Sequence, residues 1–108
     1  MIEKRKFVRL KAPIGISYSV VKKYKRASSH LTFVKNISGT GLSLLAKEGL
    51  RVGDLLKLEI QIPHLEDSID ATGEVVWLTA PEAGVRFRDI SAPDLNKILE
   101  FVYTIGIG

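Results

Sequence analysis

Residues 56–62, Leu-Lys-Leu-Glu-Ile-Gln-Ile, alternate apolar and polar side chains more regularly than any other part of the sequence. Successive side chains of an extended chain point to opposite faces, so this alternation predicts a β-strand with one buried face and one solvent-exposed face. Such a strand needs partner strands that share its apolar side. The segment therefore favours a fold built on an antiparallel sheet around one core.

The same two-residue period recurs in several short segments separated by turn formers. We expect further strands near residues 14–20, 31–36, 42–44, 69–77 and 85–90, with Pro13 at the start of the first. Trp77 falls in phase with Ile69, Ala71 and Val75. This phase favours a place in the core or at the barrel rim, although an indole ring can also stack on a base.

The C-terminal segment changes to a helical period. Apolar residues recur there at intervals of three and four, which predicts one apolar stripe of an amphipathic helix over 91–104. Ser91 is a suitable N-cap, Pro93 is tolerated in the first turn, and Asp94 suits the positive end of the helix dipole. We therefore predict an all-β fold: a six-stranded antiparallel β-barrel with a C-terminal α-helix.

Length and composition set further limits. The 108 residues suit one domain, which we divide into a mobile basic arm (1–11), a barrel (12–90) and the helix. No apolar run approaches the roughly 20 residues of a membrane-spanning helix, no secretory signal is visible, and the absence of cysteine excludes disulfides and thiolate metal sites. These features predict a cytoplasmic protein.

Positive charge is concentrated near the N-terminus. Residues 1–26 hold nine Lys and Arg but a single acid, a local balance of +8, whereas the remaining residues sum to −4. Such polarity predicts an anionic partner at one place on the surface, whether nucleotide, nucleic acid or lipid headgroup. From the basic arm alone, a merely solvated N-terminus is the more common interpretation, because most basic runs are simply solvated.

Two motifs favour a specific anion. Arg5 and Arg9 stand four residues apart in the arm, and a gap of 26 residues leads to Asn36, Ser38 and Gly41 in an Asn-x-Ser-x-x-Gly loop. Arginine can grip a phosphate or the O6/N7 edge of guanine with two parallel hydrogen bonds. A loop rich in turn formers with small side chains lets a ligand approach the backbone closely.

In order, spacing and β-rich setting, these motifs resemble the PilZ domain, a family of bacterial receptors for cyclic di-GMP. Segments 53–54, 73–77 and 84–87 are also similar to that family, so the resemblance covers almost the whole chain. The family accepts Asp or Asn at the first loop position, and this chain has Asn. An Asp there could accept hydrogen bonds from guanine or pair with an arginine, so the contact at this position can differ in detail.

The resemblance implies roles for the motif residues. Arg5 and Arg9 would grip guanine edges and phosphate, while Asn36 would offer its amide to a guanine edge or a phosphate. Ser38 would donate to phosphate or brace the turn. Gly41 would adopt positive φ or allow a close approach between ligand and backbone.

Lys4 extends this set by one position. In the family, a cation just before the first arginine goes with binding a stacked pair of cyclic di-GMP molecules. The resemblance also implies a receptor that relays the ligand by conformational change to an unidentified effector protein. The arm would fold over the barrel when the ligand satisfies its arginines.

Other functions stay open. One is a protein-interaction adaptor of the same fold that does not bind nucleotide, like PilZ members associated with type IV pili. Another is a barrel for single-stranded nucleic acid, which is disfavoured because such platforms display several stacking aromatics. We predict neither an enzyme nor a cofactor, since no nucleophile, P-loop or dinucleotide motif is present. We also predict no metal, because His30 and His64 lie in unrelated segments.

Overall fold

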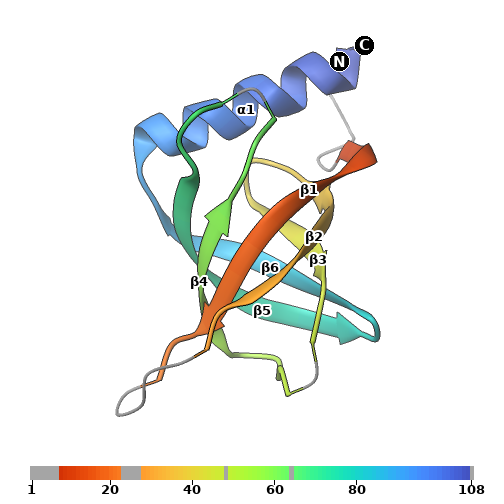
Figure 1. Ribbon diagram of the computed structural model, residues 1–108, viewed down its shortest axis with the longest axis vertical. Helices are drawn as coiled ribbons and strands as arrows, with labels where there is room; N and C mark the ends of the chain where they lie inside the picture. Colours follow the sequence, from red (N-terminus) through yellow and green to blue (C-terminus); the bar gives the residue numbers. More distant parts are fainter. Residues whose placement is uncertain (1–7, 23–27, 48, 64, 108) are drawn as a thin grey trace.

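The computed structural model describes residues 8–22, 28–47, 49–63 and 65–107, with the backbone alone for 8–13 and 105–107. Within these residues, antiparallel strands close into a barrel in the order β1-β2-β3-β6-β5-β4, and helix α1 lies across one end of it (Figure 1). This architecture confirms the predicted six-stranded barrel with a C-terminal helix. The elements are β1 (Val8–Val20), β2 (His30–Ile37), β3 (Gly41–Leu45), β4 (Leu55–Ile60), β5 (Ile69–Thr79), β6 (Glu82–Ile90) and α1 (Ala92–Ile107).

Alternating aliphatic side chains fill the interior of the barrel. On β4, Leu56, Leu58 and Ile60 are almost completely buried, whereas Lys57 and Glu59 between them are exposed. The other strands contribute inward-facing Ile, Leu and Val in the same way. Each strand pairs with two neighbours, so the described strands leave no open sheet edge.

The sequence places the start of the first strand at Pro13, but in the structure strand β1 begins upstream, at Val8. Pairing with β2 brings Arg9 opposite Asn36, then shifts register and resumes at Ile14. Pro13 lies in the shifted stretch, where its missing amide hydrogen removes no ladder hydrogen bond. The proline therefore interrupts the ladder without ending the strand. The backbone of residues 8–11 is therefore part of the barrel, although the sequence assigns these residues to the N-terminal arm.

A bulge in β2 changes which side chains face outward. Val34 pairs with Leu44 and Asn36 pairs with Ser43, so β2 carries one extra residue, Lys35, between the two pairs. An extra residue of this kind bends the strand and breaks the alternation of its faces. Val34 is buried, while Lys35 and Asn36 both leave the core side. The bulge thus turns Asn36 to the outer surface.

A second bulge, in β5, redirects Trp77. Val75 pairs with Val85, but Trp77 pairs with Gly84, which leaves Val76 as the extra residue. Val75 is fully buried, whereas Val76 and Trp77 are each 42% exposed. Trp77 therefore leaves the core face to which the alternating pattern assigned it.

Helix α1 spans Ala92–Ile107, where the sequence predicted 91–104. The expected N-cap is confirmed, because the Asp94 amide donates to the Ser91 hydroxyl at 3.2 Å. Ile98 is fully buried and joins the helix to the barrel core. Among the described residues, no helix has the length and apolar character needed to cross a membrane.

Gly41 offers a test of the tight contact between β3 and β6. A Cβ at this position would overlap the Val85 carbonyl oxygen, and it would also lie 3.0 Å from Arg86 Cα. We expect Gly41→Ala to lower the free energy of unfolding by about 1–3 kcal/mol, because backbone cannot yield as a flexible side chain can. Urea denaturation measures this change. The control Gly15→Ala adds a Cβ with nothing within 4 Å, and an equal loss in both variants would contradict the explanation.

Candidate functional site

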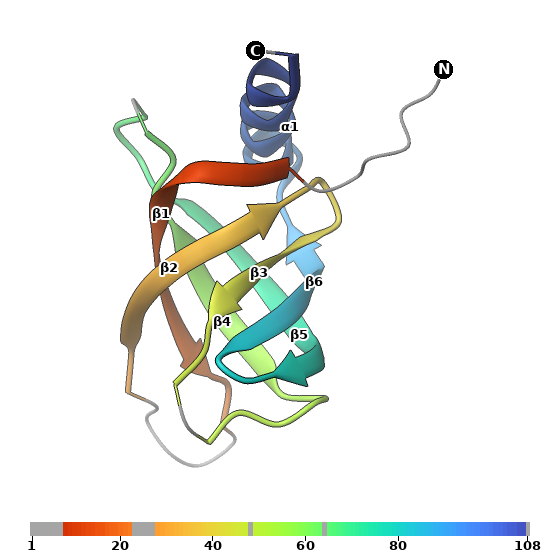
Figure 2. The same ribbon diagram turned by 90° about the vertical axis from the view of Figure 1, so that its right-hand side faces the viewer.

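Backbone pairing aligns five positions in one row across five strands. Arg9 in β1 lies opposite Asn36 in β2, which lies opposite Ser43 in β3. Ser43 pairs with Gly84 in β6, and Gly84 pairs with Trp77 in β5. Figure 2 shows β2, β3, β6 and β5 side by side on this face. The row therefore brings the arginine motif, through Arg9, next to the Asn-x-Ser-x-x-Gly motif, although 26 residues separate Arg9 from Asn36.

A groove of about 610 Å³ lies on the same face. It combines an amide, hydroxyl groups, an exposed guanidinium and an indole ring, which together suit a flat, polar, anionic ligand. The lining residues are Asn36, Thr40, Gly41, Leu42, Ser43, Val76, Trp77, Gly84, Val85 and Arg86.

The side chain of Asn36 is oriented by a neighbouring strand. Asn36 Nδ2 donates a hydrogen bond to Ser43 Oγ at 2.9 Å. Within the described part of the chain this amide makes no other hydrogen bond, so its oxygen and its second N–H can meet a ligand. Ser43 is only 4% exposed, which makes it a positioning residue beneath the groove surface.

Trp77 forms one wall of the groove because Gly84 has no side chain. A Cβ built on Gly84 would overlap the indole at Nε1, Cε2 and Cδ1, so the ring packs directly on the β6 backbone. The ring is nevertheless 42% exposed. A partly exposed indole held against a strand is a ready surface on which a base can stack.

Ser38 braces the turn between β2 and β3 and lies beneath the surface. Its side chain is 2% exposed, and its hydroxyl accepts a hydrogen bond from the Thr40 amide at 3.1 Å. The Ser38 and Thr40 hydroxyls are also hydrogen-bonded, at 3.0 Å. The Ser38 amide donates to the Gly41 carbonyl at 2.8 Å. Of the two roles expected for Ser38, this geometry supports bracing the turn, and Thr40 is the residue that lines the groove.

The structure gives Gly41 a steric role that the sequence does not suggest. The glycines with positive φ in the described residues are Gly49 and Gly53. Gly41 instead allows β3 to approach the Val85 carbonyl of β6, as the overlap with a Cβ shows. The glycine therefore keeps the floor of the groove tight.

Arg86 is the basic residue among those that line the groove in the described part of the chain. Arg86 is exposed and lines the groove, and no ion pair to it is formed within the described residues. The neighbouring Arg88 is engaged with Glu74, with Nε 2.7 Å from Oε1. Arg9 is placed by its backbone alone, and Lys4 and Arg5 lie outside the described residues.

Sequence reasoning missed several groove residues. Ser43 and Arg86 occupy ordinary alternating strand positions, and Trp77 is in phase with core residues until the bulge shifts it. Gly84 carried a usable signal, because a glycine within a strand often marks close approach of another group. That group is the Trp77 indole.

The whole barrel, including this face, matches a known family. A sequence model of the PilZ domain matches residues 3–104. The chain belongs to the PilZ domain family. PilZ domains form a family of cyclic di-GMP receptors and adaptors and are not enzymes. A search of curated proteins found no match.

Solved PilZ structures share the fold of this PilZ domain. The inhibitor of motility MotI/DgrA from Bacillus subtilis has a TM-score of 0.76 at 21% identity, covering 98% of this chain and 53% of its own. The PilZ domain of YcgR from Escherichia coli, solved with cyclic di-GMP, has a TM-score of 0.69 at 15% identity over 97% and 93%. A PilZ domain of CeSA from a cellulose-synthesizing bacterium gives 0.67 at 7% over 92% and 98%. The present chain thus spans about half the length of the motility inhibitor.

Gly84→Ala tests whether the indole rests on the β6 backbone. The added methyl group should push the ring of Trp77 outward, because the two would otherwise overlap. Trp77 is the single tryptophan of the chain, so its fluorescence reports the change directly. We expect emission at longer wavelength and stronger quenching by acrylamide, with an unchanged far-ultraviolet circular dichroism spectrum. Emission identical to the wild type and to Gly15→Ala would contradict the packing described.

Proposed function

We propose that this PilZ domain binds cyclic di-GMP in the groove over β2, β3, β6 and β5. The observation that carries the proposal is the row that places Arg9, Asn36 and Trp77 on one face of the barrel. Cyclic di-GMP presents flat guanines and negatively charged phosphates, and a receptor for it needs stacking surfaces, fork-shaped donors and cations. This groove offers each of these groups.

Each groove residue has a chemical task in this proposal. A guanine stacks on the exposed face of Trp77, where a base–aromatic contact contributes about 1–3 kcal/mol. Asn36 meets a guanine edge or a phosphate with the amide groups that Ser43 leaves available. Arg86 adds a cation at the groove rim, and Arg5 and Arg9 grip guanine and phosphate.

Ligand binding becomes a signal when the N-terminal arm changes its position. Arg5 precedes strand β1, and Arg9 lies in β1 opposite Asn36. A ligand held by both arginines therefore joins the arm to the outer surface of β2. The resulting surface is read by an effector protein in the bacterial cytoplasm, where cyclic di-GMP serves as a second messenger.

Calorimetry of the full chain with cyclic di-GMP tests the proposed site. We expect saturable binding that quenches Trp77 fluorescence, because a stacked base changes the surroundings of the indole. Arg9→Lys should weaken binding about tenfold or more, since a bidentate arginine contact contributes about 1–3 kcal/mol of discrimination. Asn36→Ala and Trp77→Ala should each weaken binding by a similar factor.

The matched control is Lys57→Ala, which removes one cation from β4, outside this groove. Its affinity should equal that of the wild type. Binding that Lys57→Ala weakens and Arg9→Lys leaves unchanged would indicate attraction by net charge alone, because Arg9→Lys keeps the positive charge. If the chain binds no cyclic di-GMP, the alternative is a protein-interaction adaptor that does not use a nucleotide. If an oligonucleotide competes with cyclic di-GMP for the groove, the alternative is a barrel that binds single-stranded nucleic acid.

Lys4 allows a separate test of stoichiometry. The proposal assigns this cation to a second, stacked cyclic di-GMP molecule, whose phosphates need further neutralisation. Titration should saturate near two ligand molecules per wild-type chain and near one per chain in Lys4→Ala, with Arg9 left intact. Saturation at one molecule in both proteins would remove the role of Lys4 and leave the single-ligand site standing.

A further inference from the structure

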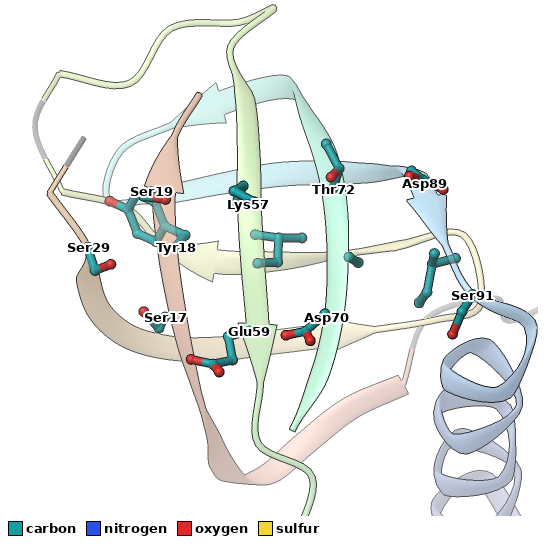
Figure 3. Close-up of a pocket in the computed structure, with 13 residues that line it drawn as sticks. Ser17, Tyr18, Ser19, Ser29, Lys57, Glu59, Asp70, Thr72, Asp89 and Ser91 are labelled. Atoms are coloured by element: carbon teal, nitrogen blue, oxygen red, sulfur yellow. The ribbon is translucent and has the colours of Figure 1, made fainter. Parts of the chain in front are cut away.

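A second groove runs along strand β1, outside the proposed nucleotide site. It consists of a hollow of about 570 Å³ and another of about 300 Å³, which share Ser17 and Glu59. Backbone pairing aligns its central row across four strands as Leu31, Ser17, Glu59 and Asp70. Figure 3 shows Ser17, Glu59 and Asp70 of this row together with Lys57.

Two large apolar side chains on β2 form one wall of this groove. Leu31 is 78% exposed and Phe33 is 48% exposed, and both line the smaller hollow. They pair with Ser17 and Gly15 of β1, and the small Ser17 side chain and the absence of one at Gly15 keep the groove floor low. A Cβ built on Gly15 would have no atom within 4 Å, which shows that this floor is open. Apolar side chains exposed beside an open groove are typical of a protein interaction site.

The opposite wall is acidic. Glu59, Asp70 and Asp89 line the larger hollow, where Lys57 is the only basic residue in the lining that the structure describes. Glu59 accepts a hydrogen bond from the Ser68 hydroxyl at 3.2 Å. Within the described residues none of the three carboxylates forms a salt bridge. The wall therefore carries net negative charge on a chain whose total charge is +4.

The chemistry of the two walls defines the occupant. Nucleic acids and anionic membrane surfaces are repelled by three carboxylates, whereas lysine or arginine side chains are attracted. Strand addition to the barrel is excluded, because β1 already pairs with both β2 and β4. The partner must then be recognised by side chains, with apolar groups against Leu31 and Phe33 and cations toward Glu59 and Asp70.

We propose that the groove along β1 is a docking site for a cationic amphipathic segment of a partner protein. Its apolar side covers Leu31 and Phe33, and its Lys and Arg side chains face Glu59, Asp70 and Asp89. Nucleotide binding uses other side chains, so the docking site stands or falls independently of the proposed function. Strand β2 contributes to both sites, through Asn36 in one and through Leu31 and Phe33 in the other.

Nuclear magnetic resonance of the full chain with designed peptides tests this docking site. The probe is a synthetic peptide of leucine and lysine, patterned with leucine on one helical face and lysine on the other. We expect it to bind saturably and to shift the amide signals of residues 15–19, 31–33 and 57–59. A peptide in which glutamate replaces every lysine should leave these signals unchanged.

Variants separate the contributions of the two walls. Leu31→Ser with Phe33→Ser should weaken peptide binding about tenfold, because both apolar contacts with the leucine face are lost and a few anchor residues carry most of the affinity of an interface. Glu59→Lys with Asp70→Lys should weaken it several-fold and reduce its dependence on salt. The controls are Val52→Ser, an exposed apolar residue in a turn, and Glu100→Lys on helix α1, which should both bind as the wild type does.

Several results would overturn the docking site. One is that the glutamate peptide binds as tightly as the lysine peptide. Another is that the amide signals change only around the groove of Asn36 and Trp77. A third is that the control variants weaken peptide binding as much as the variants in the β1 groove do. Sedimentation of the chain alone supplies a further test. Self-association that Leu31→Ser with Phe33→Ser abolishes would assign this groove to a second copy of the chain and not to a partner protein.

Discussion

Closure of the sheet between β1 and β4 is the constraint on which the rest of the structure depends. Because these strands pair from Ile16 to Val20, every described strand has two neighbours and the aliphatic interior is sealed. Inward positions are then committed to the core, and only outward positions and the barrel ends remain for binding. Because aliphatic side chains fill the interior, a binding site has to lie on the outer surface or at a barrel end.

Local breaks in the strand ladder determine what the outside presents. The bulges at Lys35 and Val76 each insert one residue, and they turn Asn36 and Trp77, respectively, away from the core. Asn36 and Trp77 reach the same groove by this means, and the absence of a side chain at Gly84 lets the indole rest on β6. Regular alternation of side chains specifies the barrel. The groove forms where the two bulges interrupt that alternation.

This origin explains which features could be predicted from the sequence. The barrel follows from repeated two-residue alternation, and the helix follows from its period and the Ser91 cap. The bulges could not be predicted, because one extra residue is defined only against a partner strand. The pattern therefore favours the core or the barrel rim for Trp77, and it gives no sign of a role for Ser43 and Arg86. The sequence assigns Arg9 to an arm because Pro13 is typical of a strand start. In the structure, pairing with β2 extends β1 upstream of Pro13 to include Arg9.

Distance limits how the two grooves can influence each other. Trp77 stands seven residues along β5 from Asp70, the pairing partner of Glu59, which is roughly 23 Å of strand, while electrostatic interactions at physiological salt are screened over about 8 Å. The charge of a nucleotide near Trp77 therefore has little direct effect at Glu59 on another face. Strand β2 connects the two sites, but buried Val34 and its pairing on both sides hold its middle in place. A partner docked in the β1 groove as proposed would consequently sense a bound nucleotide best by also reaching the rim beside Asn36, because β2 contributes to both surfaces.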